Sequence, residues 1–273
     1  MLAWAAAPTV LAHPSALERV ARLDSLIRSR PEEPRLYVQR AQAHAEDGHF
    51  DEALSDLHRA AALGEPVEVA YDLGVVHHRM GRLEEARSDF DRWLARHPTH
   101  APALLQRAQT LRELGDRAAA LADYEAYFER HPKPNPGDYL AAARMLATPD
   151  GSDPAGAITV LDAGMQRLGI VPTLQQEAIA LERARGRVAA ALDRLETLRP
   201  SLGASPDWKV VRGELLLEAG RREEGRKQLE VARAQLSSLR VTQARVALGT
   251  RIEALLEKAR NGPLASEVAR TRP

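Results

Sequence analysis

Glycines recur at a nearly fixed spacing along most of this chain, and that spacing restricts the fold to a repeat architecture. Gly48, Gly81 and Gly115 are 33 and 34 residues apart, and Gly186 and Gly220 are again 34 apart. The interval from Gly115 to Gly186 is 71 residues, which is two periods plus three residues. A fourth, less regular repeat with a short insertion therefore lies between them. Periods of this length are typical of solenoids in which each repeat is one small structural unit.

Residues of fixed size surround these glycines. Small residues lie five residues after them, at Ala53, Ala86, Ala120, Ala191 and Gly225, and seven residues before them, at Ala41, Gly74, Ala108 and Gly213. Large apolar residues lie nine residues after them, at Leu57, Phe90, Tyr124, Leu195 and Leu229. The pattern predicts two amphipathic helices per repeat, joined at a glycine that adopts positive φ and ends the first helix. The small residues let the two helix backbones approach closely, and the large residue packs against the next repeat.

Residues 73–98 resemble the tetratricopeptide repeat, with Gly74, Gly81, Ala86, Phe90 and Pro98 at the places where that family has its motif residues. The resemblance extends over residues 34–236. It implies an all-α fold, a right-handed solenoid of about six helical hairpins with an extra N-terminal helix and a C-terminal capping helix. One hairpin cannot bury its apolar face alone, so the hairpins must stack on one another.

The helix and turn signals divide the chain into seven parts. We expect an apolar segment at 1–12, an N-terminal helix within 13–30, three repeats in 31–134, a degenerate fourth repeat in 135–171, a fifth and sixth repeat in 172–237, a capping helix in 238–260 and a disordered tail at 261–273. In the fourth repeat the sequence TPDGSDP replaces the tight glycine turn. It is either a hinge between two halves of the chain or a longer surface loop.

The first twelve residues carry no charge and end in Val10-Leu11-Ala12, the kind of small-residue site that signal peptidase cuts. We therefore predict an exported, periplasmic protein of bacterial type. The basic leader of a signal peptide is missing, so the alternative is an apolar arm on a cytoplasmic protein. Cleavage would leave His13 at the N-terminus, where its amine and imidazole could bind copper, but the sequence ties no other histidine to it.

The formal net charge is zero, which gives no indication of nucleic-acid binding. The charge is unevenly distributed: residues 1–169 contain 19 basic and 25 acidic residues, and residues 170–273 contain 19 and 13. This asymmetry is either chance over solvated faces or a guide to self-association of opposite ends. No run of apolar residues is long enough to span a membrane.

The sequence contains no recognisable catalytic or cofactor-binding motif. It has no glycine-rich phosphate loop, no nucleophile elbow, no His-Glu-x-x-His and no cysteine. His77 falls where the repeat places a helix-packing aromatic residue, and His97 and His100 flank the proline of a turn. We therefore expect a protein that is not an enzyme and that binds no cofactor.

The resemblance implies a binding groove lined by the first helices of successive repeats. Carried over to this chain, its lining residues are Arg35, Val38, Gln39, Gln42, Glu68, Tyr71, Asp72, Val75, His78, Leu105, Gln109, Arg112 and Tyr139. Glutamines can hydrogen-bond the backbone of an extended peptide, and tyrosines can anchor it. Val38 and Gln42 stand where chaperone-tail clamps of this family have Lys and Asn, so we expect no chaperone C-terminus as ligand.

The sequence thus predicts a non-catalytic adaptor or scaffold that holds a partner peptide or protein in this groove. Two alternatives remain open at this point. The chain could be a structural subunit that stacks on a larger assembly through its ends, or a periplasmic metal-binding protein that uses His13.

Overall fold

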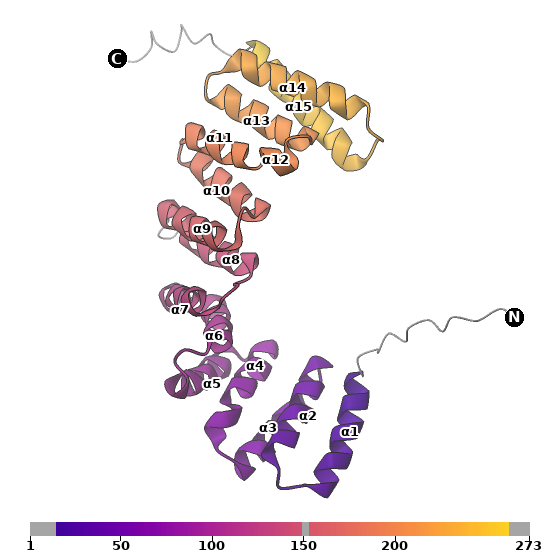
Figure 1. Cartoon of the computed structure of the whole chain (residues 1–273), viewed down its shortest axis with the longest axis vertical. Coiled ribbons are helices and arrows are strands. Elements are labelled where there is room, and N and C mark those ends of the chain that lie inside the picture. Colours follow the sequence, from indigo (N-terminus) through magenta and orange to yellow (C-terminus); the bar gives the residue numbers. More distant parts are fainter. Residues whose placement is uncertain (1–14, 149–152, 262–273) are drawn as a thin grey trace, which may run out of the picture. The chain divides into compact units, whose positions relative to one another are not determined.

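The structure is a computed structural model that describes residues 15–148 and 153–261, and in that part of the chain it contains helices and no strands (Figure 1). The chain divides into two compact units, Met1–Pro132 and Lys133–Pro273. We call them the N-terminal unit and the C-terminal unit. The predicted all-α fold of stacked helical hairpins is confirmed.

The N-terminal unit consists of one helix followed by three hairpins. The single helix α1 (Ala16–Ser29) packs on α2, and the hairpins are α2 (Pro34–Glu46) with α3 (Phe50–Leu63), α4 (Ala70–Arg79) with α5 (Leu83–Arg96), and α6 (Ala101–Leu114) with α7 (Arg117–Arg130). A short 3-10 turn, η1 (Pro66–Val69), leads into α4. The first helices contact one another, α2 with α4 and α4 with α6, so they line one face of the unit.

The C-terminal unit repeats this plan with more irregular connections. Its hairpins are α8 (Pro136–Leu146) with α9 (Pro154–Leu168), α10 (Pro172–Ala184) with α11 (Val188–Thr197), and α13 (Pro206–Glu218) with α14 (Arg222–Ser237). A single turn, α12 (Arg199–Leu202), joins the last two, and α15 (Gln243–Asn261) packs on α13 and α14. The division between the units comes after Pro132, before the fourth hairpin, and not at the insertion inside that hairpin.

The five glycines that set the period adopt the backbone conformation expected of them. Gly48, Gly81, Gly115, Gly186 and Gly220 have φ between 71° and 84°. Each ends the first helix of a hairpin, and no non-glycine residue in the described part of the chain has a positive φ. The periodic glycines are therefore turn residues, as the sequence predicts.

Small residues lie where the two helices of a hairpin cross, as the sequence also predicts. A Cβ atom built on Gly74 would lie 2.6 Å from the ring of Phe90, a side chain with no exposed surface. Gly213 and Gly225 face each other in the sixth hairpin, and a Cβ on Gly225 would lie 2.9 Å from the carbonyl oxygen of Gly213. At these crossings a Cβ atom would collide with a side chain or the backbone of the facing helix.

Buried ion pairs, which the sequence reading did not foresee, join neighbouring helices at equivalent places. Arg40 on α2 binds Asp56 on α3 through two hydrogen bonds of 2.8 and 2.6 Å, and Asp24 on α1 through one of 2.6 Å. Arg107 on α6 binds Asp123 through two bonds of 2.7 Å and Asp91 through one of 2.8 Å. Each arginine thus connects its own hairpin to the preceding helix.

Two further hairpins contain parts of this arrangement. Asp89 occupies the place of Asp56 in the second hairpin, where Leu73 replaces the arginine, and it binds His77 at 2.7 Å and also Arg92. In the sixth hairpin Arg212 binds Glu196 on the preceding second helix at 2.6 Å. The spacing of 16 residues between partners could have revealed these pairs in the sequence.

Gly74→Ala should destabilise the protein, because the added methyl group would press on the buried ring of Phe90. We expect a loss of about 1–3 kcal/mol, typical of overpacking, reduced by the better helix propensity of alanine. Urea unfolding followed by circular dichroism would measure it. Gly249→Ala in α15 is the matched control, since its Cβ would make an ordinary contact of 3.5 Å with Leu236. A stable Gly74→Ala variant would contradict the packing described here.

Arg40→Ala should also destabilise the protein, because it leaves Asp56, which is 6% exposed, without its cation. Breaking a buried ion pair costs about 3–5 kcal/mol. Because Arg40 is partly exposed, we expect the free energy of unfolding to fall by an amount near the lower end of that range. Arg233→Ala removes an exposed pair with Glu253 and should cost less than about 1 kcal/mol. Equal effects of the two substitutions on the free energy of unfolding would refute a structural role for the Arg40 network.

Candidate functional site

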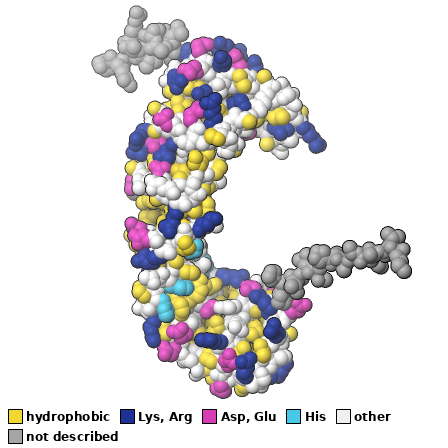
Figure 2. Space-filling view, viewed as in Figure 1, with side chains coloured by type: hydrophobic (Ala, Val, Ile, Leu, Met, Phe, Trp, Pro, Cys, Tyr) yellow, Lys and Arg dark blue, Asp and Glu magenta, His cyan; other side chains and the backbone are white. Residues whose placement is uncertain are grey.

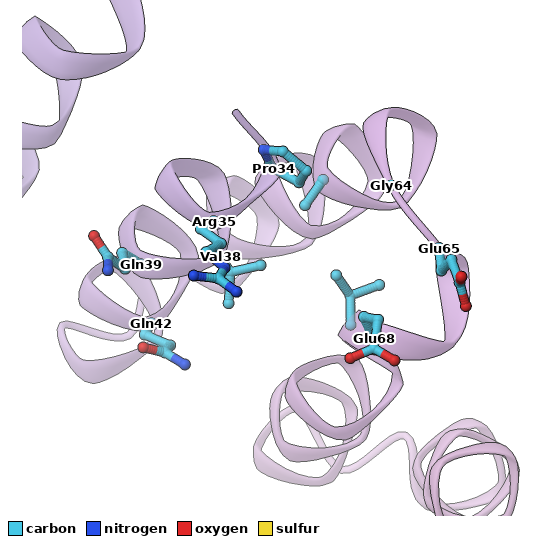
Figure 3. Close-up of a pocket in the computed structure, with 10 residues that line it drawn as sticks. Pro34, Arg35, Val38, Gln39, Gln42, Gly64, Glu65 and Glu68 are labelled. Carbon is cyan, nitrogen blue, oxygen red and sulfur yellow. The ribbon is translucent and has the colours of Figure 1, made fainter. Parts of the chain in front are cut away.

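A pocket of about 480 Å³ lies between α2 and η1 in the N-terminal unit, and we call it the α2–η1 pocket. It contains five of the residues predicted for the groove, namely Arg35, Val38, Gln39, Gln42 and Glu68. Figure 3 shows Arg35, Gln39 and Gln42 on the α2 side and Glu65 and Glu68 on the opposite side. Pro34, Val38 and Val69 supply an apolar lining. The predicted residues thus meet at a concave surface.

A second pocket, of about 400 Å³, lies between α1 and α2, and we call it the α1–α2 pocket. Leu23 and Leu26 supply its apolar part, and Arg19 and Arg22 its charge. Gln39 and Gln42 line both pockets, so the two glutamines stand between them. The sequence predicts α1 as an extra N-terminal helix but gives no indication that its side chains line a pocket.

The link between the first two hairpins on this face is a hydrogen bond of 2.9 Å from Gln42 Nε2 to Asp72 Oδ1. Burial raises the pKa of Asp72, and the hydrogen bond from Gln42 opposes that rise. Gln42 keeps its amide oxygen for another partner. Arg35 and Glu68 have no ion pair within the part of the chain that the structure describes, so both can contact a ligand.

Tyr71 lies in an aromatic cluster at the start of the second hairpin. Its ring centroid is 5.9 Å from that of Trp93 and 5.1 Å from that of His100. Burial raises the pKa of Tyr71. Leu105 is partly buried against the same core, so Tyr71 and Leu105 form an apolar surface on the first helices α4 and α6. All the histidines of the described chain belong to the N-terminal unit, where some of them show among apolar side chains in Figure 2.

Four other predicted residues lie on α4 and α6. Val75 and Gln109 are half-buried and Arg112 is exposed beside Glu113. His78 makes a contact of 2.9 Å from Nδ1 to Thr110 Oγ1, and the hydroxyl of Thr110 itself donates to the carbonyl of Gln106. Nδ1 of His78 is therefore the donor, and this hydrogen bond joins the second hairpin to the third.

Tyr139, the last predicted groove residue, is only 2% exposed and packs against Gly164 inside the fourth hairpin. Burial raises its pKa. It also belongs to the C-terminal unit. Tyr139 therefore serves as a packing residue at a helix crossing and offers no surface to a ligand. The fourth repeat lacks the turn glycine that sets the alignment of the other repeats. The sequence therefore did not predict that Tyr139 packs against Gly164.

The first helices of the C-terminal unit carry ion pairs in place of free polar side chains. Arg144 binds Glu177 at 2.9 Å, and Arg183 binds Glu214 at 2.8 Å and also Glu218. Arg251 on α15 adds a second cation to Glu214. Burial works against ionisation of Glu214, but the two arginines lower its pKa. These charges satisfy one another within the unit.

Other predictions concern residues outside the described part of the chain. The apolar segment Met1–Ala12, the cleavage site and the copper ligand His13 all fall there, as do residues 262–273 of the expected tail. Among the described residues no His, Cys, Asp and Glu side chains form a group that could hold a metal ion. None of the helices described is both long and apolar enough to cross a membrane.

Comparison with known families identifies the repeat. Residues 38–101 and residues 102–134 each match a sequence model of the tetratricopeptide repeat. The chain contains tetratricopeptide repeats over residues 38–134. Proteins with tetratricopeptide repeats generally bind other proteins or peptides and generally are not catalysts. A search of curated proteins finds no match to this tetratricopeptide repeat sequence.

Solved tetratricopeptide repeat structures share its fold. A part of such a protein from Cytophaga hutchinsonii aligns over 94% of this chain and 95% of its own, with a TM-score of 0.57 and 12% identity. One from Parabacteroides merdae covers 90% and 93%, with a TM-score of 0.51 and 17% identity. PilW, described as a type IV pilus biogenesis factor, covers 72% and 90%, with a TM-score of 0.54 and 19% identity. At these identities the likeness shows the fold alone.

Asp72→Asn should stabilise this protein at neutral pH. The asparagine amide keeps an oxygen that accepts from Gln42 but avoids placing a charge at this half-buried position. The pKa of Asp72 in the folded protein is raised above its ordinary value of 3.8, which holds in the unfolded chain. As pH rises from 3.8 through the folded-state pKa, the unfolded chain loses this proton first, so the wild-type protein loses stability over that range. The advantage of the variant should therefore appear over that window and persist above it.

Urea unfolding of both proteins across this pH range would measure the difference. Asp193→Asn, at an exposed position on α11, is the control and should show little change. A loss of stability in Asp72→Asn at neutral pH would mean that the ionised carboxylate makes a favourable contact, contrary to this interpretation.

Proposed function

We propose that the chain is a non-catalytic adaptor that binds an extended segment of a partner protein in the groove of the N-terminal unit. The groove consists of the α1–α2 pocket, the α2–η1 pocket and the surface of Tyr71 and Leu105. The observation that carries the proposal is the pair Gln39 and Gln42, which lines both pockets. Their amides can pair with the backbone of a peptide that passes from one pocket to the other.

The two units differ in a way that favours the N-terminal one as the binding site. Along its first helices, Arg35 and Glu68 line a pocket without an ion pair among the described residues. In the C-terminal unit, Arg144, Arg183 and Arg251 are all engaged by glutamates of neighbouring first helices. A ligand there would have to break existing ion pairs, whereas a ligand that contacts Arg35 and Glu68 in the N-terminal groove would break none within the described residues.

Selection of random peptides on the immobilised full-length protein, followed by calorimetry, would test the proposal. Binding of the selected peptides should fall at least about tenfold when both glutamines are changed, Gln39→Ala with Gln42→Ala, because backbone hydrogen bonds are lost. Gln166→Ala, at an exposed position on α9 of the other unit, should leave affinity unchanged. Peptides that bind both variants as tightly as the wild type would place the site elsewhere and refute the groove.

A further inference from the structure

The groove has arginines on its α1 side and glutamates on its η1 side. This difference in charge indicates which kind of peptide segment the groove would bind. Building on the proposed function, we infer that the groove selects an extended segment with an acidic side chain at one end. The carboxylate binds at Arg22 in the α1–α2 pocket. The adjoining backbone crosses Gln39 and Gln42, and the segment continues toward Glu68 in the α2–η1 pocket.

The α1–α2 pocket offers an arginine whose charge no carboxylate of the described residues neutralises. Two arginines, Arg19 and Arg22, line it, and no carboxylate is among its lining residues. Arg19 is engaged by Glu46. Arg22 is exposed, and within the described residues it has no ion pair. A guanidinium in this position can take a carboxylate in a bidentate manner, which a lysine could not do.

The floor of the same pocket is apolar. Leu23 is buried and Leu26 half-buried, and both face it beside Ala43. An acidic residue next to an apolar one fits this combination of a charged rim and an apolar floor. A nucleic acid backbone has no apolar side chain to place on this floor. The zero net charge of the chain also gives a nucleic acid no general electrostatic attraction.

The far wall of the groove has the opposite sign. Glu65 and Glu68 stand on it, and Glu65 is held by Arg96 at 3.2 Å. Glu68 remains available for a cation, while Arg35 faces it from α2 without pairing with it. Positive charge near α1 and negative charge near η1 therefore give the groove a polarity, and a segment with acidic and basic residues in the matching order is favoured.

A charge-reversal experiment tests this inference with peptides from the same display selection, synthesised with an amidated C-terminus. The groove-dependent peptides should be enriched in Asp or Glu. Arg22→Glu should weaken their binding at least about tenfold, and replacing the acidic residue of the peptide by Lys should restore affinity for that variant. Arg28→Glu introduces the same charge change on α1 away from both pockets and should leave affinity within about twofold of the wild type.

The outcomes separate this inference from the function on which it rests. Peptides that depend on Gln39 and Gln42 but lack acidic residues, or that are indifferent to Arg22→Glu, would overturn the inference and leave the groove intact. If only peptides with a free C-terminal carboxylate bind, Arg22 binds a chain terminus and not an acidic side chain. That result also overturns the inference. If no selected peptide depends on the two glutamines, the proposed function fails, and this inference fails with it.

Discussion

The close approach of two helix backbones in each hairpin is the constraint on which the rest of the structure depends. At Gly74 the ring of Phe90 occupies the space that a side chain would need, and a Cβ atom on Gly213 or Gly225 would collide with a leucine of the facing helix and with its backbone. This closeness lets a large residue of the second helix lie against the first. It also fixes the direction in which the outer surfaces of the hairpin face, and so it determines which residues can line a groove.

Buried ionic contacts add specificity to this apolar packing. Arg40 and Arg107 each hold two carboxylates, one in the same hairpin and one on the preceding helix. A carboxylate such as Asp56 cannot remain buried without its arginine, so these contacts tolerate little change in how one element sits on the next. The second hairpin has no arginine there, and His77 and Arg92 satisfy Asp89 from within the hairpin.

The periodic part of the fold could be predicted because it is local. The turn glycines and the small residues at crossings recur at fixed intervals, and both hold in the structure. The large residues are buried as well, but Phe90 and Leu229 lie against glycines of their own hairpin, where we expected contact with the next repeat. What the sequence did not reveal depends on contacts between repeats. The role of α1 in a pocket requires knowledge of how that helix lies on the first hairpin. Tyr139 shows a different limit, since the irregular turn within its own hairpin gives no sequence signal for the register that places it against Gly164.

The two units use the polar residues of the same repeat plan in different ways. In both units the first helices present polar residues on one face, but the partners of those residues differ. Arg183 forms ion pairs with Glu214 and Glu218, so these charges are neutralised within the fold. Where Arg22, Arg35 and Glu68 lie beside pockets, they remain accessible to solvent. Because ion pairing within a repeat array and recognition by it draw on the same positions, a groove can bind a ligand only where neighbouring repeats do not already satisfy each other's charges.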